Sequence, residues 1–343
     1  MGSGDGSKRP GKSGPGKSGL GEFELIERYL APLAAGAEGA FGLHNDAAVL
    51  PLAPGERLVT TVDTLIHGRH FLDCPPDLVA RKLLRVNLSD LAAMGAEPFG
   101  YLLAVAWPRD IEEAWVAAFC DGLASDQETF GVTLFGGDTT ATPGPMTLSL
   151  TAFGKLSGAA VLDRGSLQPG DDLYVSGTIG EAFLGLCVLR GELDGLDAAT
   201  RAALIGRYRL PEPRLALGQA LLNEGLARSA LDVSDGLAAD LGHLLEVSGV
   251  GAEIELAAIP FSAAARAGLA RLGAAAPRLL AGGDDYELLF AAPPAHRDAL
   301  QSLARRLDLD LARIGSVRRE PGLLLRDATG GEIPLKETGW THF

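Results

Sequence analysis

The stretch DLVARKLLRVNLSDLAAMGAEPFGYLLAVAW, residues 77–107, decides the fold because its periodicity changes once. Its first part, residues 77–96, repeats apolar side chains at helical spacing, with Asp77 placed to cap the helix and Gly95 placed to end it. Its last part, residues 99–107, is a short apolar run that is typical of a strand. The stretch therefore predicts a helix that leads directly into a strand.

The same alternation extends to both sides of this stretch. Residues 22–33 predict an amphipathic opening helix with Phe23, Ile26, Leu30 and Leu33 on one face. The expected elements that follow are strand 57–65, helix 110–131, strand 132–138, which we expect to break at two glycines, and strand 146–155. Alternating strands and helices give this half an α/β character.

A segment rich in Gly, Ser, Pro and Asp, residues 156–172, separates this half from a second series of elements. The second series comprises strands 173–177, 229–236, 252–256, 285–292 and 312–317 and helices 181–190, 211–225 and 237–249. Two domains are the natural expectation for 343 residues. We expect a disordered tail at 1–20, an N-terminal domain at 21–157 and a C-terminal domain at 158–343.

A phosphate-binding pattern in the tail is misleading. The sequence GKSGPGKS, residues 11–18, has the spacing of a P-loop, but a P-loop needs a preceding strand and a helix that begins at its Lys-Ser. Neither flank supplies one, and the Gly/Ser/Lys composition is typical of a flexible linker. We therefore exclude residues 1–20 from the fold and predict that deleting them leaves activity unchanged.

Charge and composition argue against several classes of function. The formal net charge is −14 at pH 7, although the tail is basic. Such a chain repels a polyanionic backbone, so nucleic-acid binding is disfavoured, whereas cations are attracted. We expect no membrane span and no signal peptide. The cysteines Cys74, Cys120 and Cys187 are far apart and lack CxxC spacing, which indicates core thiols in a reducing cytoplasm.

Aspartates recur at predicted strand ends and in Gly/Ser turns. They are Asp46, Asp63, Asp90, Asp138, Asp232 and Asp235. Any one of them is also explained as a turn former or a helix cap. Strand ends in a twisted α/β sheet open onto a shared crevice, where the set can converge. Carboxylates about 4 Å apart repel by about 4 kcal/mol at a dielectric constant of about 20, so convergence would require cations. Oxygen ligands favour Mg²⁺ or Ca²⁺, and several Mg²⁺ ions suggest a polyphosphate substrate.

Seven motifs occur in order between about Gly21 and Phe343 and together resemble the thiamine-monophosphate kinases. These belong to the superfamily of aminoimidazole-ribotide and selenophosphate synthetases. The motifs are GEFELIERYL, NDAAVL, TTVDTLIHGRHF, RVNLSDLAAMGAEP, FGGDTT, LDVSDGLAADL and GGDDYELLF. The resemblance implies a two-domain α/β (α+β) fold, with a dimeric β-barrel-like N-terminal core, flanking helices and a C-terminal α/β sandwich. It also implies a homodimeric kinase that transfers the γ-phosphoryl group of ATP directly onto thiamine monophosphate.

The resemblance also implies the residues of the site. Ligands of several Mg²⁺ ions would be Asp46, Thr61, Val62 through its carbonyl, Asp63, Asp90, Asp138, Asp232 and Asp235. Contacts to ATP would come from Gly137, Asp138, Arg164 and Ser234, and contacts to thiamine monophosphate from His70, Asp284 and Trp340. No general base is assigned, because the acceptor is an ionised phosphate oxygen and the transfer requires charge neutralisation and in-line positioning.

Two departures from the family pattern accompany this resemblance. The chain has Asn45-Asp46 where the family has an Asp-Asp pair, so one metal or water contact is altered. It has Asp284 where the family has Glu, which is one methylene longer, so a water could bridge the gap to the substrate.

Two alternative functions remain. The chain could be another ATP-using member of the superfamily, or a non-catalytic nucleotide- or metal-binding protein. A selenophosphate synthetase would carry a reactive Cys or Sec in a glycine-rich N-terminal segment, whereas the first cysteine is Cys74. A hydrogenase-maturation relative would end in a modifiable Cys, whereas this chain ends in Phe343.

Overall fold

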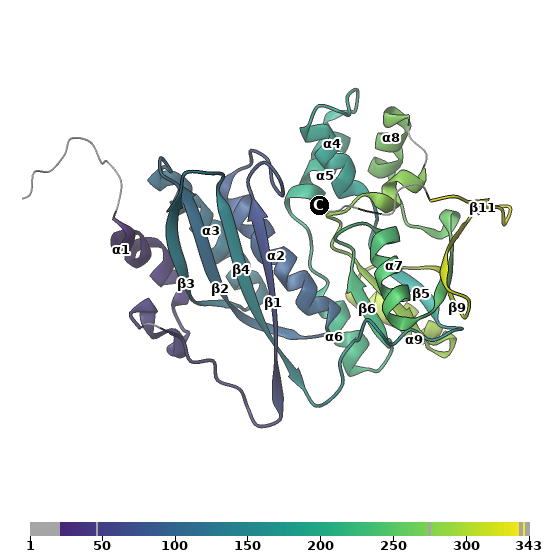
Figure 1. Cartoon of the computed structure of the whole chain (residues 1–343), viewed down its shortest axis with the longest axis horizontal. Helices are drawn as coiled ribbons and strands as arrows, with labels where there is room; N and C mark the ends of the chain where they lie inside the picture. Colours follow the sequence, from purple (N-terminus) through teal and green to yellow (C-terminus); the bar gives the residue numbers. More distant parts are fainter. Residues whose placement is uncertain (1–20, 46, 274–275, 336–338, 340–343) are drawn as a thin grey trace, which may run out of the picture.

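The computed structural model describes residues 21–45, 47–273, 276–335 and 339, and it contains one sheet in each half of the chain (Figure 1). The tail at 1–20, Asp46 and Trp340 lie outside the described residues. The expectations placed on them are therefore not addressed by the structure.

The N-terminal half is built on a sheet with the strand order β1-β4-β2-β3. Its strands are β1 (Glu56–Ile66), β2 (Glu97–Pro108), β3 (Thr133–Thr142) and β4 (Thr147–Ser157). Only β2 and β3 are parallel. Within the described part of the chain the sheet is open, with β1 and β3 at its edges. The expected barrel-like core would be shared by two copies of the chain, and a single chain does not test it.

Two long helices cover one face of this sheet, α2 (Pro76–Ala93) and α3 (Glu113–Phe130), and Figure 1 shows both behind the strands. The opposite face is covered only in part, by apolar side chains of the segment 38–50. On β1, Leu58 is 43% exposed and Val62 is 60% exposed. The sheet therefore has one buried face and one partly open, apolar face.

The C-terminal half contains a mixed sheet with the order β11-β10-β7-β9-β5-β8-β6. Its strands are β5 (Asp172–Ser176), β6 (Ser229–Asp232), β7 (Gly251–Glu255), β8 (Leu288–Ala292), β9 (Leu311–Arg318), β10 (Gly322–Arg326) and β11 (Glu332–Ile333). Helix α7 (Leu237–Ser248) packs on one face. Helices α6 (Leu215–Asn223) and α9 (Arg297–Leu307) pack on the other. This layering confirms the expected α/β class.

A separate helical cluster adjoins this sheet near the middle of the molecule (Figure 1). It consists of α4 (Glu181–Leu189), α5 (Ala198–Arg209) and α8 (Ala263–Leu272), which share one apolar core.

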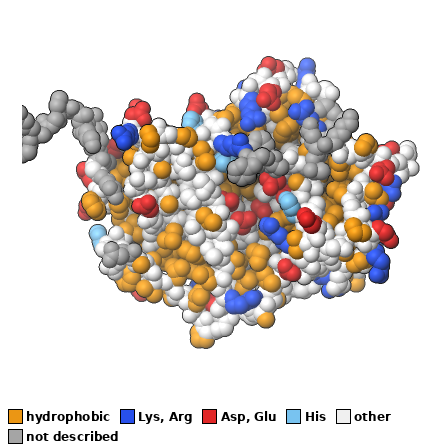
Figure 2. Space-filling view, viewed as in Figure 1, with side chains coloured by type: hydrophobic (Ala, Val, Ile, Leu, Met, Phe, Trp, Pro, Cys, Tyr) orange, Lys and Arg blue, Asp and Glu red, His pale blue; other side chains and the backbone are white. Residues whose placement is uncertain are grey.

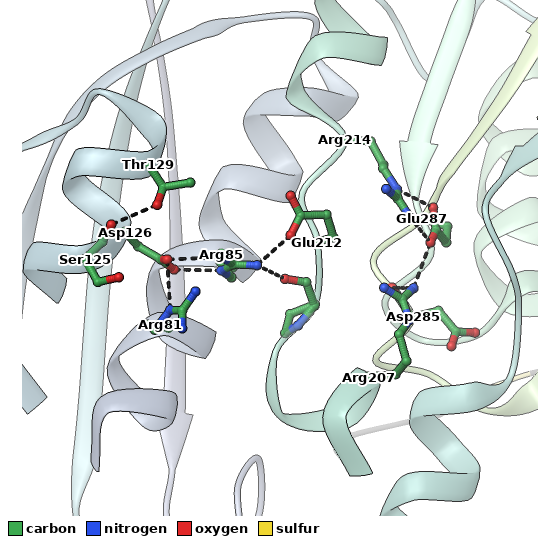
Figure 3. Close-up of polar contacts among 11 residues, drawn as sticks. Arg81, Arg85, Ser125, Asp126, Thr129, Arg207, Glu212, Arg214, Asp285 and Glu287 are labelled. Atoms are coloured by element: carbon green, nitrogen blue, oxygen red, sulfur yellow. Dashed lines mark hydrogen bonds and ion pairs between the residues drawn. The ribbon is translucent and has the colours of Figure 1, made fainter. Parts of the chain in front are cut away.

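Helix α2 joins the two halves. Its Ala92 and Ala93 share an apolar cluster with Leu217 of α6. The approach is close, because a Cβ at Gly218 would lie 1.9 Å from the Ala92 carbonyl oxygen. A polar contact adds to this packing: Arg85 Nη1 donates to Glu212 Oε2 at 2.6 Å (Figure 3). The helix therefore belongs to the cores of both halves.

The opening helix differs from the expected one. Only its first turn, α1 (Glu22–Leu25), is α-helical, and a π-helical turn (Ile26–Leu30) and a 3₁₀ turn (Ala31–Ala34) follow. Leu30 and Leu33 are buried, but Phe23 is 83% exposed, so its assignment to the buried face was wrong. Pro32, which lacks a backbone N–H and restricts the preceding residue, explains why regular α-helix does not continue.

Strand β3 also differs from expectation, since it continues through Gly136 and Gly137 instead of breaking there. Gly137 pairs with Leu103 of β2, and a Cβ at position 137 would lie 1.8 Å from the Leu103 carbonyl oxygen. The glycine allows two backbones to approach closely within the sheet.

Candidate functional site

Three aspartates from both halves converge where the halves meet. Asp63 lies on β1, Asp90 on α2, and Asp232 at the end of β6. The Thr61 hydroxyl donates to Asp90 Oδ2 at 2.5 Å, and the Ser89 hydroxyl of α2 donates to Asp232 Oδ2 at 2.7 Å. Figure 2 shows acidic side chains gathered near the middle of this view.

Burial raises the pKa of all three carboxyl groups, and the charge of Asp90 raises the pKa of Asp63 and Asp232 further. Burial, and then the charge of Asp90, raise the pKa of Asp63 to about 7. Burial raises the pKa of Asp90, against the opposing effects of the Thr61 hydrogen bond and the positive charge of Arg164. The pKa of Asp232 lies well above its ordinary value because of burial and then the charge of Asp90. A counter-charge would stabilise their ionised forms, and cations supply one.

Local structure explains this convergence. Side chains alternate along β1, so Thr61 and Asp63 face α2 while Val62 between them faces the opposite side of the sheet. Beyond β6 the chain turns at Gly236, whose φ is 121°, and enters α7. Asp240 in the first turn of α7 accepts hydrogen bonds from the N–H groups of Asp235 and Gly236, both at 3.1 Å. The loop after Asp232 is therefore fixed by its own helix.

A cavity of about 560 Å³ adjoins the aspartates. Residues of the N-terminal half in its wall include Asp63, Arg69 and His70, and residues of the C-terminal half include Phe183, Arg190, Ser234, Asp235, Asp284 and Tyr286. Carboxylates, cations and aromatic rings thus line one space. Such a wall suits a ligand that combines an anionic group with a ring.

His70 has a defined orientation in this wall. The backbone N–H of Ile66 donates to His70 Nδ1 at 3.0 Å. Because Nδ1 accepts this bond, the neutral imidazole carries its proton on Nε2.

The cavity wall contains a backbone segment with two residues at positive φ. Asp284 has a φ of 70° and Tyr286 a φ of 53°. The Asp284 N–H donates to Ser234 O and the Tyr286 N–H donates to Val233 O, both at 2.8 Å. These bonds attach the segment to the loop after β6. Left-handed backbone is unfavourable for such side chains and is typical of functional positions.

Asp285 and Glu287, which alternate with these two residues, hold the segment on the side away from the cavity. Asp285 accepts from the Gly180 N–H at 2.7 Å and the Ala182 N–H at 3.3 Å, at the start of α4. Burial raises the pKa of Asp285 to about 8, although both hydrogen bonds oppose this. Residues 284 and 286 thus line the cavity while residue 285 points into the protein.

Glu287 is the second anchor and is fully buried. Arg214 donates to both of its oxygens, at 2.6 and 2.5 Å, and Arg207 donates to Oε1 at 2.7 Å (Figure 3). The Ser176 hydroxyl donates to Oε2 at 2.6 Å. Two guanidinium groups and one hydroxyl therefore hold the end of this wall segment.

Asp138 lies apart from the other aspartates. It lines a different cavity, of about 660 Å³, together with Gly137 and Asn45. Asp138 lies on β3, and strands β2 and β4 lie between β3 and β1 in the sheet. Three strand spacings therefore separate Asp138 from β1. At about 4.8 Å per strand this is about 14 Å. Within one chain, the structure does not bring Asp138 to Asp63.

The remaining candidates lie around the cluster. Ser234 and Asp235 line the 560 Å³ cavity, and the positive charge of Arg164 acts on Asp90. The side chain of Val62 faces the other side of the sheet, so only its backbone can face the aspartates. Among the residues that the structure describes, no three His, Cys, Asp or Glu side chains form a ready-made metal centre.

Several residues of the site were not predicted from the sequence. They include Lys82, Arg207, Arg214, Tyr286 and Glu287. Two of these residues could have been found from the sequence, because a charged side chain that is buried within an apolar run has a specific partner. Lys82 lies within the helical run 77–96, and Glu287 precedes the apolar strand LLFAA.

Comparisons with known proteins show the family of the chain. The family model described as "AIR synthase related protein, N-terminal domain" matches residues 44–156, and the model for the C-terminal domain matches residues 168–327. The chain therefore belongs to the AIR synthase-related family. A thiamine-monophosphate kinase of Caulobacter vibrioides is 42% identical over 326 residues, which cover 94% of this chain and 90% of that relative. Within the family, the chain belongs to the thiamine-monophosphate kinases.

Solved structures are similar over most of the chain. The crystal structure of thiamine-monophosphate kinase from Stenotrophomonas maltophilia K279a is 40% identical, with a TM-score of 0.79, and the match covers 89% of this chain and 96% of that one. A structure of AaThiL complexed with AMPPCP and TMP is 29% identical, with a TM-score of 0.75 and coverage of 94% and 97%. Among the described residues, no helix is long and apolar enough to cross a membrane.

Proposed function

We propose that the protein transfers the γ-phosphoryl group of ATP onto thiamine monophosphate and forms thiamine diphosphate. The observation that carries this proposal is the convergence of Asp63, Asp90 and Asp232 beside a cavity of about 560 Å³. The AaThiL structure, whose ligands are AMPPCP and TMP, supports the same pair of ligands for this chain.

The donor set fits Mg²⁺, because carboxylate and hydroxyl oxygens are hard ligands. Burial raises the pKa of Asp63 and Asp232, and a bound cation would stabilise their ionised forms. The residues that we assign to bind it are Asp46, Thr61, Val62, Asp63, Asp90, Asp138, Asp232 and Asp235. When bound, Mg²⁺ ions neutralise the phosphates and favour in-line transfer. The protein would bring carboxylates from both halves to the phosphate chain.

The remaining residues would bind and orient the two substrates. We assign Gly137, Asp138, Arg164 and Ser234 to ATP and His70, Asp284 and Trp340 to thiamine monophosphate. His70 presents an Nε2–H donor at the cavity wall, which suits a phosphate oxygen. Asp284 presents a carboxylate, which suits an amino group on the heterocycle. We assign no general base, because the acceptor oxygen is already ionised.

We further propose that the enzyme is a cytoplasmic homodimer with domains at 21–157 and 158–343. The partly open sheet face with Leu58 and Val62 supports burial against a second copy. The free thiols Cys74, Cys120 and Cys187 support a reducing compartment. The two family-model matches, which end at 156 and begin at 168, support the division.

The test is product formation by the purified protein. Incubation with Mg-ATP and thiamine monophosphate should give ADP and thiamine diphosphate in equal amounts, and omission of the acceptor should abolish both. Binding of Mg-ATP without any thiamine diphosphate would refute the activity and leave a non-catalytic nucleotide-binding protein. ADP release that does not depend on the acceptor would favour another ATP-using member of the superfamily.

A pair of variants strengthens this test. Asp90→Asn should lose turnover while the protein stays folded. Asp197→Asn is the matched control, because Asp197 is an exposed cap of α5 that accepts from the Thr200 N–H at 2.9 Å, and Asn caps a helix equally well. Equal activity of both variants would remove Asp90 from the site.

A further inference from the structure

A buried lysine reaches the cavity wall from the other half of the protein. Lys82 lies in α2 and is 2% exposed. Its Nζ lies 3.0 Å from Asp284 Oδ1 and 3.8 Å from the centroid of the Tyr208 ring. The ammonium group is thus enclosed between a carboxylate and an aromatic face, both of which belong to the C-terminal half.

The environment of this ion pair is asymmetric. The side chain of Lys82 is 3% exposed, whereas that of Asp284 is 30% exposed and lines the cavity. A lysine is almost never fully buried unless it is paired, since an unpaired buried ammonium is strongly destabilising. Within the described residues Lys82 Nζ makes no well-aligned hydrogen bond, so the ion pair and the ring are its main contacts. The protein therefore buries a charge in order to contact a group that remains accessible.

The contacts of Asp284 leave part of its carboxylate available. Lys82 and the Tyr286 hydroxyl, at 3.5 Å, both approach Oδ1. Among the described residues, the hydrogen bond and the ion pair of the Asp284 side chain both involve Oδ1 and not Oδ2. The left-handed backbone at Asp284, with a φ of 70°, restricts the direction in which the side chain leaves the chain. Asp284 is therefore oriented from one side and open to a ligand on the other.

We propose that Lys82 is a positioning residue that holds the Asp284 carboxylate as a hydrogen-bond acceptor for an amino-substituted heterocycle in the cavity. The inference rests on the proposed function, in which that heterocycle is the aminopyrimidine of thiamine monophosphate. This role of Lys82 also explains why the chain can have aspartate where the family pattern has glutamate. A carboxylate that a buried cation already orients does not need the extra methylene of glutamate.

The same helix would then align both ends of the substrate. Lys82 and Asp90 are separated by eight residues of α2, which is about 12 Å along the axis at 1.5 Å per residue. Lys82 would orient the contact to the heterocycle, and Asp90 would help to bind the cations at the phosphate.

The experiment measures KM separately for each substrate. Lys82→Met should raise KM for thiamine monophosphate about tenfold or more, equivalent to about 1.4 kcal/mol, while KM for ATP and kcat change less than about twofold. Lys82→Arg, which restores the cation, should recover part of the loss. Asp284→Asn should raise the same KM, and Lys82→Met in that background should add little, since the two side chains act as one unit.

Lys155→Met is the matched control. Lys155 Nζ lies 3.9 Å from Glu56 Oε2 and 4.6 Å from the centroid of the Phe99 ring, so it also contacts a carboxylate and an aromatic ring, but away from the cavity and with 27% of its side chain exposed. Both KM values should stay unchanged in this variant.

Each outcome bears on the inference. An unchanged KM for thiamine monophosphate in folded Lys82→Met, equal losses for both substrates, or additive losses in the double variant would overturn it. If Lys82→Met fails to fold, Asp284→Asn decides, and an unchanged KM there overturns it. If the wild-type protein forms no thiamine diphosphate, the proposed function fails. Calorimetric binding of thiamine monophosphate then tests Lys82 separately, and equal affinities of wild type and Lys82→Met would overturn the inference.

Discussion

Glu287→Gln tests how the cavity wall is held. The substitution keeps the shape of the side chain and removes its charge. Glu287 is fully buried and accepts hydrogen bonds from Arg207 and Arg214 (Figure 3). It also accepts one from the Ser176 hydroxyl. A glutamine offers one oxygen, and its amide nitrogen would face guanidinium groups that can only donate. Both arginines would therefore lose their ionised partner.

The expected magnitude follows from burial. Removing one member of a buried ion pair lowers the free energy of unfolding by about 3–5 kcal/mol. The side chains of Arg207 and Arg214 are 22% and 18% exposed, so partial rehydration places the loss near the lower limit. A loss of about 3 kcal/mol corresponds to a fall in Tm of about 6–12 °C. Since Glu287 anchors the segment that contains Asp284, KM for thiamine monophosphate should rise as well.

The assay is equilibrium unfolding in urea, combined with kinetics at saturating ATP. Glu224→Gln is the matched control, because Glu224 pairs with Arg306 on the surface, where the two side chains are 43% and 55% exposed. That variant should lose at most about 1 kcal/mol. Similar losses in the two variants, or a loss below about 1 kcal/mol for Glu287→Gln, would refute the argument from burial.

Three further predictions concern packing, charge and thiol reactivity. Gly218→Ala should lower the free energy of unfolding by more than about 2 kcal/mol in urea titrations, because the new Cβ would lie 1.9 Å from the Ala92 carbonyl oxygen. Gly206→Ala, on an open face of α5, should instead stabilise by up to about 1 kcal/mol, and equal effects would contradict the clash. Asp232→Asn should slow thiamine diphosphate formation by about two orders of magnitude without loss of stability, since it neutralises a buried carboxylate whose pKa is already raised; a large fall in Tm would count against this. Burial raises the pKa of Cys187 to about 11 and that of Cys120 to about 12, and a raised pKa keeps a thiol protonated to higher pH. At pH 8 iodoacetamide should therefore label both cysteines slowly in the native protein and quickly in urea, as followed by mass spectrometry, and fast native labelling would contradict the burial of these thiols.

Helices and strands in which apolar residues recur with a clear period could be predicted from the sequence. Segments whose conformation depends on tertiary contacts could not. Strand 57–65 and helix 77–96 correspond to β1 and α2 within a few residues. The expected strand 285–292 begins only at Leu288. The residues before Leu288 are instead held by hydrogen bonds from Asp284 and Tyr286 to Ser234 and Val233, which lie in a separate part of the chain. No pattern in the local sequence predicts these bonds.

The candidate site shows the same division. The six aspartates predicted to converge include Asp63, Asp90 and Asp232, which the structure brings together. Strand order separates Asp138 from them, and order within a sheet leaves no trace in the period of a strand. The pairing of Lys82 with Asp284 depends on how the two halves dock, which no single segment encodes.

Three residues of helix α2, spaced three and four residues apart, make polar contacts to the C-terminal half. Lys82 contacts Asp284, Arg85 contacts Glu212, and Ser89 contacts Asp232. Inserting or deleting one residue within α2 would rotate everything beyond that point by about 100° relative to what precedes it. The contacts on opposite sides of that point could then no longer form together. We therefore expect insertions and deletions to occur in the loops of this protein and the length of α2 to stay constant.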